Sequence, residues 1–279
     1  MNPALPAPCF ILSDAHLGTP GNPGNNGTLG TRGEERHDPE RSIVALMELA
    51  RREAKSVVIN GDLFDFWFEW RSVMPRVGFR ALAAIAAAAE AGVRVVWIAG
   101  NHDCWGGDIL REAGVEYHVG PWRGTIGNWE TLIEHGDGLR DREDAGYRAL
   151  RTVLRNPLAI WAFRHLLHPD WATALAQRTS HTSRGMRPRD GGEGLARVAE
   201  ARLAADRELD LYIFGHSHAA AMERRPEGAV YANPGAWMDG PGLLQVTDGA
   251  LSQCDFAGGA LRELRRTPLR PKKAWQRDR

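Results

Sequence analysis

The chain has 279 residues, of which 43% are hydrophobic and 25% charged, and its 35 Lys and Arg residues balance its 35 Asp and Glu residues. This composition excludes wholesale disorder, a collagen-like repeat and a coiled coil, and zero net charge argues against a nucleic-acid footprint over the whole chain. The length fits one large α/β domain with a sizeable core. Three scattered cysteines without a C-x-x-C motif, and no apparent signal segment, predict a reducing, cytoplasmic setting.

Short apolar strands alternate with helices in the first hundred residues. The predicted strands are Cys9–Leu12, Ser56–Ile59 and Val93–Ile98, and the predicted helices are Ser42–Ala54 and Gly78–Ala91. A Gly-, Asn- and Pro-rich surface loop is expected over Gly18–Gly33, and Gly92 is a suitable helix C-cap. This alternation predicts parallel pairing of the strands through right-handed crossovers.

The second half of the chain has a different pattern. Further strands are predicted at Thr131–Ile133, Leu211–Phe214 and Val230–Ala232. Residues 141–207 carry apolar side chains at helical spacing, broken at Pro157 and Pro169, and predict a helical insertion with a polar loop over Thr179–Gly194. The strand-rich segment Leu211–Phe256 has the short turns typical of antiparallel pairing.

Polar residues follow five of these strands directly. They are Asp14, His16, Asp62, Asn101, His102, His135, His216 and His218. Residues i and i+2 of an extended chain point to the same side, so D-x-H and H-x-H can each place two ligands on one ion. A lone His after a strand is more often structural, but repetition after five strands favours a metal centre. The mixed nitrogen and oxygen donors suit Mn, Fe, Zn or Ni.

The ordered blocks D-x-H, G-D, G-N-H-D, H-G-D and G-H-x-H resemble the calcineurin-like metallophosphoesterases. The resemblance covers about residues 9–247 and implies an α/β fold, a four-layer αββα sandwich with two metal ions at the sheet edge. It gives one ion the ligands Asp14, His16, Asp62 and His218, and the other Asp62, Asn101, His135 and His216.

In this arrangement Asp62 bridges the two ions, whose mutual repulsion requires a shared anionic ligand. His102 is the expected catalytic cation, which contacts a phosphate oxygen or protonates the leaving group. Asp103 is expected to orient His102 or a neighbouring ligand.

Within the family, the stretch GDLFDFW (61–67), the helical insertion and HPDW (168–171) resemble the UDP-2,3-diacylglucosamine hydrolase group. Those enzymes split the pyrophosphate of a UDP-linked acylated sugar in lipid A synthesis, giving UMP and the lipid sugar 1-phosphate, usually with manganese. The main branch of the group has Arg where this chain has His102. Two alternatives stay open: a hydrolase of a nucleotide, phosphomonoester or phosphodiester, and a non-catalytic scaffold, which the complete ligand set opposes.

The insertion is the expected selector of the substrate. Its apolar residues Trp161, Phe163, Leu166 and Trp171 either line an acyl groove or pack between helices. Asn233 either contacts phosphate or belongs to a turn, and the aromatic run 64–70 either packs under the site or stacks on uracil. Arg140, Arg142 and Arg184 either bind phosphate or face solvent.

The predicted organisation is one domain over residues 1–261, with the insertion at 141–207, and a basic tail at 262–279. The tail holds eight basic and two acidic residues, so it either meets an anionic membrane surface or is a solvated terminus. Together these features predict a lipid-linked substrate, peripheral contact with the inner membrane and no nucleic-acid partner. The oligomeric state stays open.

Overall fold

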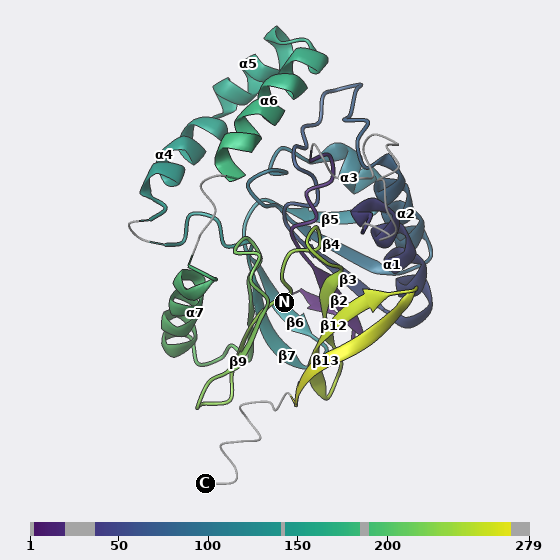
Figure 1. Ribbon diagram of the computed structural model, residues 1–279, viewed down its shortest axis with the longest axis vertical. Coiled ribbons are helices and arrows are strands. Elements are labelled where there is room, and N and C mark those ends of the chain that lie inside the picture. The colour runs from purple at the N-terminus through teal and green to yellow at the C-terminus, as the bar shows by residue number, and fades with distance from the viewer. Residues whose placement is uncertain (1–2, 20–36, 141–142, 185–189, 269–279) are drawn as a thin grey trace, which may run out of the picture.

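The computed structural model describes residues 3–19, 37–140, 143–184 and 190–268. Two β-sheets pack face to face, with helices on both outer sides, and three further helices project beyond the strand ends (Figure 1). The predicted four-layer αββα sandwich is therefore confirmed. The predicted loop over Gly18–Gly33 lies almost wholly outside the described residues.

The larger sheet has seven strands in the order β13-β12-β11-β2-β3-β4-β5. Its parallel half consists of β2 (Cys9–Leu12), β3 (Ser56–Asn60), β4 (Arg94–Ile98) and β5 (Val115–His118). Its antiparallel half consists of β11 (Gly242–Val246), β12 (Ala250–Ala257) and β13 (Ala260–Pro268). The predicted parallel pairing of the first three core strands is confirmed.

The smaller sheet has six strands in the order β1-β6-β7-β8-β10-β9. They are β1 (Ala4–Leu5), β6 (Trp122–Ile126), β7 (Trp129–Ile133), β8 (Leu211–Ile213), β9 (Ala221–Arg224) and β10 (Val230–Asn233). The expectation of antiparallel pairing after Leu211 is wrong for one pair, because β8 and β10 run parallel. The chain returns through β9 on the far side of β10, which lets β10 point the same way as β8.

The sheet faces are covered by α1 (Pro39–Glu53), α2 (Phe79–Glu90), the short α3 (Asp108–Glu112) and α7 (Glu193–Ala205). Residues of β3 show how alternation builds the layers. Val57 and Ile59 pack in the cluster that includes α1 and α2, whereas Val58 packs between the sheets. On the outer face of the smaller sheet, a third cluster includes residues of α7.

Local sequence explains where the helices begin. The Asp38 carboxylate accepts hydrogen bonds from the amides of Glu40 and Arg41, and Pro39 is the first residue of α1. Asn156 caps α5 (Pro157–Leu166) in the same way, and this helix also begins with a proline. Proline begins α6 (Pro169–Arg184) as well, as the predicted breaks require.

Three helices of the predicted insertion stand apart from the sheets: α4 (Ala145–Leu154), α5 (Pro157–Leu166) and α6 (Pro169–Arg184). No residue of α4 or α5 is fully buried. The loop expected over Thr179–Gly194 is wrong in its first part, because α6 continues to Arg184. Among the described residues, no helix is long and apolar enough to cross a membrane.

Candidate metal centre

Five turns bring the predicted ligands to one edge of the paired sheets. The turns after β2, β3 and β4 come from the larger sheet, and those after β7 and β8 come from the smaller one. The first two turns continue the parallel pairing of their strands: the Asp14 amide donates to the Gly61 carbonyl (3.1 Å) and the His16 amide to the Asp62 carbonyl (2.9 Å). Backbone hydrogen bonds, and not only side-chain contacts, thus hold the turns of Asp14, His16 and Asp62 together.

Five of the predicted ligands have a left-handed backbone conformation: Asp14 (φ 55°), His16 (44°), Asp62 (52°), His216 (59°) and His218 (59°). They are the only non-glycine residues in that conformation in the part of the chain that the structure describes. Such conformations cost of order 1–3 kcal/mol each and persist where the surrounding structure imposes them, typically at functional sites.

Glycine precedes three ligand turns because a larger residue would not fit. A Cβ atom at Gly61 would lie 2.3 Å from His135 Nδ1, and one at Gly100 would lie 2.1 Å from Asp62 Oδ1. A Cβ at Gly215 would lie 2.9 Å from Asp14 Oδ2. The G-D, G-N-H and G-H-x-H motifs therefore reflect close approach of the turns to one another.

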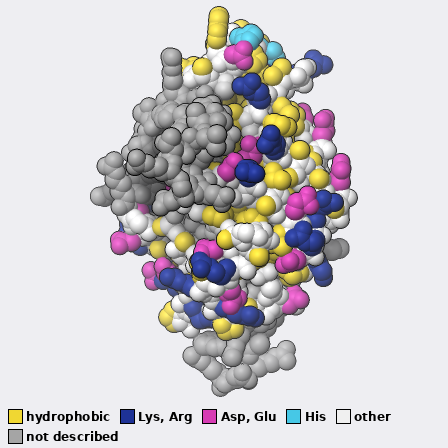
Figure 2. Space-filling model, turned by 45° about the vertical axis from the view of Figure 1, so that its right-hand side comes forward, with side chains coloured by type: hydrophobic (Ala, Val, Ile, Leu, Met, Phe, Trp, Pro, Cys, Tyr) yellow, Lys and Arg dark blue, Asp and Glu magenta, His cyan; other side chains and the backbone are white. Residues whose placement is uncertain are grey.

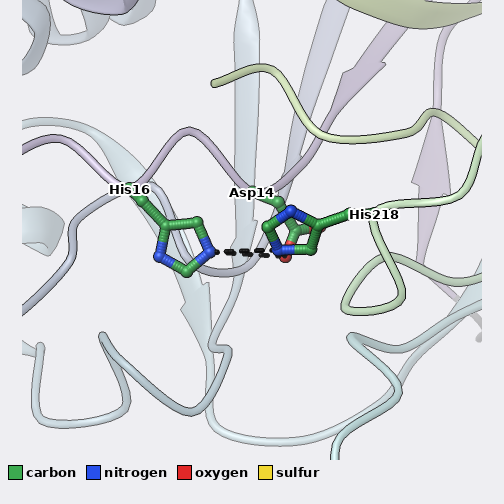
Figure 3. A group of neighbouring side chains, drawn as sticks. All are labelled: Asp14, His16 and His218. Atoms are coloured by element: carbon green, nitrogen blue, oxygen red, sulfur yellow. Dashed lines mark hydrogen bonds and ion pairs between the residues drawn. The ribbon is translucent and has the colours of Figure 1, made fainter. Parts of the chain in front are cut away.

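The first group of ligands is Asp14, His16 and His218 (Figure 3). The two Nε2 atoms of the histidines are 3.3 Å apart, and His218 Nε2 is 3.3 Å from Asp14 Oδ1. His16 Nε2 is 3.8 Å from the same oxygen. These three atoms converge from both sheets on a space that one cation could fill.

The second group is Asp62, His135 and His216. His135 Nε2 lies 3.2 Å from Asp62 Oδ2, and that oxygen is also 3.9 Å from His16 Nε2 in the first group. Asp62 therefore reaches both groups, as a bridging ligand must. The structure thus brings together the residues predicted for each ion, apart from Asn101, whose amide oxygen is considered next. His102 forms a third such group with His16 and Asp62.

Several of the donor atoms lack hydrogen-bond partners within the described ranges, as expected for atoms that bind a metal ion. Asp14 Oδ1, Asn101 Oδ1 and His135 Nε2 are buried and have no hydrogen-bond partner among the described residues. Buried polar atoms without partners cost free energy unless something satisfies them. The other ring nitrogen of His135 is occupied: Nδ1 donates to the Asn60 carbonyl (2.9 Å), and Nε2 is the nitrogen that faces Asp62.

Electrostatics at the site favours a cation. Burial alone would raise the pKa of Asp62, but the charge of His135 and then that of His102 outweigh it and hold that pKa well below its usual range. Burial outweighs the opposing charge of Asp62 at His16 and holds the pKa of His16 well below its usual range, which leaves the neutral imidazole that metals require. Burial would also lower the pKa of His135, yet the Asp62 carboxylate raises it well above its usual range.

His102 and Asp103 have different surroundings. His102 Nδ1 donates to the Asp65 carbonyl (2.8 Å), and its backbone amide donates to Asp62 Oδ1 (2.9 Å). Asp103 is fully buried and accepts hydrogen bonds from the amides of Gly100 (2.7 Å) and Leu63 (2.9 Å). It therefore ties together the loops that carry Asn101 and Asp62. Burial raises the pKa of Asp103 to about 7.

The predicted substrate residues divide into two kinds. Trp161, Leu166 and Trp171 are 54%, 70% and 74% exposed. Phe163 instead packs against Phe68, with ring centroids 4.8 Å apart.

The aromatic residues of the run 64–70 are divided between two hydrophobic clusters. Phe64 and Trp67 belong to the cluster under α1 and α2, whereas Phe66, Phe68 and Trp70 pack with the insertion helices. Packing thus accounts for the described contacts of this run.

Of the two roles predicted for Asn233, phosphate contact or a turn, the described contacts are those of a turn. The Asn233 side chain is buried, donates to the Gly215 carbonyl (2.8 Å) and to Ser217 Oγ (3.1 Å), and accepts from the Gly235 amide (2.9 Å). It holds the loop that carries His216. Similarly, Arg140 is buried and paired with Asp144, at 2.6 Å between Nη2 and Oδ1, while Arg142 lies outside the described residues and the side chain of Arg184 is not described.

Sequence reasoning missed a carboxylate beside the first ligand group. Asp65 Oδ1 lies 3.8 Å from His16 Nδ1, and the carbonyl of the same residue holds His102. The available signal was position: Asp65 follows Asp62 by three residues, on the loop that pairs with the turn of His16. Carboxylates behind a metal-binding His orient its ring.

Comparison with known proteins agrees with this geometry. The calcineurin-like phosphoesterase family matches residues 8–220. A UDP-2,3-diacylglucosamine hydrolase from Porphyromonas gingivalis is 33% identical over 232 residues, which cover 75% of this chain and 82% of the relative. Another from Azotobacter vinelandii is 31% identical over 192 residues, which cover 68% and 78%.

A solved structure of a dimetal phosphatase from Danio rerio aligns with 94% of this chain and 98% of its own, at 14% identity and a TM-score of 0.43. All seven predicted metal ligands lie within the residues that the family matches.

Proposed function

The chain belongs to the calcineurin-like phosphoesterase family, and we propose that it is a dinuclear-metal hydrolase that cleaves the pyrophosphate of UDP-2,3-diacylglucosamine. The products would be UMP and the lipid sugar 1-phosphate, an intermediate of lipid A synthesis. The observation that carries the proposal is the pair of His and Asp groups, joined through Asp62, in a chain whose insertion has exposed apolar side chains. The names of the relatives support the same substrate.

The metal ligands would be the residues of the two groups together with Asn101. Asp14, His16 and His218 would hold one divalent ion, Asn101, His135 and His216 the other, with Asp62 shared. Two such ions supply Lewis-acid activation of a water molecule and of the phosphoryl oxygens. We propose manganese, with iron, zinc and nickel as outcomes of metal analysis.

His102 would act on the phosphate itself. Because a carbonyl only accepts hydrogen bonds, the Asp65 carbonyl fixes the proton of His102 on Nδ1. A ring nitrogen of His102 lies within 4.8 Å of the ligand atoms of His16 and Asp62, so the imidazole borders both ligand groups. When protonated, Nε2 can donate to a phosphoryl oxygen or give its proton to the leaving oxygen.

The acyl chains would lie against the insertion. Large exposed apolar side chains, among them those of Leu158, Trp161, Leu166 and Trp171, are clustered on α5 and α6. In the space-filling view, hydrophobic side chains stand at the upper end of the molecule beside His and charged side chains (Figure 2). Large exposed apolar side chains that gather on one element mark lipid or protein contacts. We propose that they meet both the acyl chains and the membrane surface from which the substrate is taken.

A direct assay tests the proposal. Purified protein loaded with manganese should release UMP from UDP-2,3-diacylglucosamine in detergent micelles. The control variant Asp62→Ala should bind no metal and should release no UMP. Hydrolysis of bis(p-nitrophenyl) phosphate without release of UMP would reject this substrate and favour another phosphoester. Absence of metal after reconstitution would reject the catalytic reading altogether.

A further inference from the structure

Helix α4 contacts two of the ligand-bearing loops at once. On the loop after β7, the Tyr147 hydroxyl donates to Asp137 Oδ2 (2.6 Å) and Arg151 Nη1 donates to the Asp137 carbonyl (3.3 Å). On the loop after β4, the Trp105 indole donates to the carbonyl of Leu154, the last residue of α4 (3.0 Å). One helix of the insertion is thereby tied to the loops of His135 and Asn101.

Arg155, the C-cap of α4, contacts both loops with its own side chain. Its Nη2 lies 3.7 Å from Asp137 Oδ2, and its guanidinium interacts with the side chain of Cys104. Asp137 is buried, as is Cys104, and Arg155 is 23% exposed. Arg151 Nη1 lies 3.6 Å from the same oxygen, so the buried Asp137 carboxylate is paired with two arginines at this end of α4.

Among the described residues, the α5 region contacts the core mainly through apolar and aromatic side chains. Ile160, Phe163 and Leu167 of the α5 region pack against the aromatic residues Phe68 and Trp70. Apolar packing stabilises contact without fixing orientation as hydrogen bonds and ion pairs do. The polar contacts of α4 are therefore the features that set where the insertion stands over the metal centre.

We infer that Arg155, together with Asp137 and Tyr147, is a positioning latch that sets the affinity for the lipid-bearing half of the substrate. The inference rests on the proposed function, because the exposed apolar helices are its lipid contact. The latch touches no reacting atom. Its loss lets α4 to α6 shift relative to the ligand loops, so the lipid side loses its preformed contact while the metal ligands stay in place.

Steady-state kinetics of Arg155→Gln tests the latch. With UDP-2,3-diacylglucosamine, KM should rise about tenfold while kcat stays within about twofold, because lost uniform binding raises KM alone. Metal content and hydrolysis of bis(p-nitrophenyl) phosphate should match the wild type. Arg155→Lys, which keeps the charge, should recover part of the affinity, and Arg51→Gln on the exposed side of α1 is the matched control.

Two kinetic results would overturn the latch: an unchanged KM, or an equal loss of activity toward both substrates, which would indicate a general structural defect. Tyr147→Phe carries the test if Arg155→Gln does not fold, since it removes one hydroxyl and keeps the ring. Hydrogen exchange of α4 and α5 should quicken at least tenfold in either variant, with α1 unchanged; unchanged exchange rejects the latch. A wild type that releases no UMP rejects the substrate, and the exchange result still decides whether the latch exists.

Discussion

At the scale of single residues, the geometry allows His102 two roles, as a proton donor to the substrate or as a metal ligand. This histidine follows the predicted ligand Asn101, yet its Nδ1 is committed to the Asp65 carbonyl. A ring nitrogen also falls near His16 and Asp62, so His102 competes with the assigned ligands for a place on a metal ion. Substitution of His102 can show whether this residue is a metal ligand or a proton donor.

We predict that His102→Ala keeps both metal ions and loses about 10²–10⁴-fold in kcat, the range typical of a general acid. Elemental analysis and steady-state kinetics on the same preparation measure both quantities. His102→Arg distinguishes the two roles: recovered rate would mean that charge suffices, and no recovery would mean that the proton is required. Loss of one metal ion from His102→Ala would show that His102 is a ligand.

Gly100 makes a second prediction at this scale. A Cβ atom there would lie 2.1 Å from Asp62 Oδ1 and 2.7 Å from the Asp62 amide nitrogen, so Gly100→Ala must displace the bridging carboxylate. We expect a loss of about 1–3 kcal/mol in the free energy of unfolding, as for other overpacked sites, and a marked loss of bound metal. Gly249→Ala is the control, because no atom lies within 4 Å of its Cβ position. Equal metal content in the two variants would contradict the close-approach argument.

At the scale of elements, α5 and α6 carry several large apolar side chains that are exposed to solvent. Trp161 and Trp171 are 54% and 74% exposed, so Glu at both positions should change the melting temperature little. Each exposed Trp that enters a lipid phase contributes of order 1.5–3 kcal/mol, so the double variant should bind anionic vesicles at least tenfold more weakly.

Vesicle sedimentation measures this binding. The matched control is Phe79→Glu on α2, since Phe79 is also 54% exposed but lies outside the insertion. Vesicle binding that falls equally in the control, or in neither variant, would reject the insertion as the membrane-facing element.

Sequence periodicity predicted those elements whose signal is local. Cys9–Leu12 was identified as a strand with its observed bounds, and the helix breaks at Pro157 and Pro169 fall at the starts of α5 and α6. The parallel pairing of β8 and β10 was not predicted, because it depends on where β9 is placed, which no local pattern encodes.

The same distinction holds at the site. The ligand types and their order were readable because each follows an apolar strand. The sequence left Asn233 with two roles, phosphate contact or a turn, since only the folded chain shows that its amide holds the Gly215–Ser217 loop. The contacts of Arg155 were missed for the same reason: its partners Asp137 and Cys104 are distant in sequence.

At the scale of the whole molecule, the metal centre lies on the seam between two sheets. Asp14, His16 and Asp62 follow strands of the larger sheet, whereas His135 and His218 follow strands of the smaller one. Each ligand group therefore draws on both sheets. Without a cation, Asp14 and Asp62 bring two carboxylates into a buried space, and five left-handed residues retain their strain.

A metal ion that binds only the assembled seam must stabilise the fold by mass action. At a free concentration a thousandfold above Kd, one ion contributes about 4.1 kcal/mol. For a domain near this size, about 2–4 °C of melting temperature accompanies each kcal/mol, so one ion should raise Tm by about 8–16 °C. Calorimetry of wild-type protein with manganese and after EDTA treatment measures the shift, and Asp62→Ala, which lacks the bridge, should show almost none. An equal Tm with and without bound metal, verified by elemental analysis, would mean that the sheets are held together by their apolar interface alone.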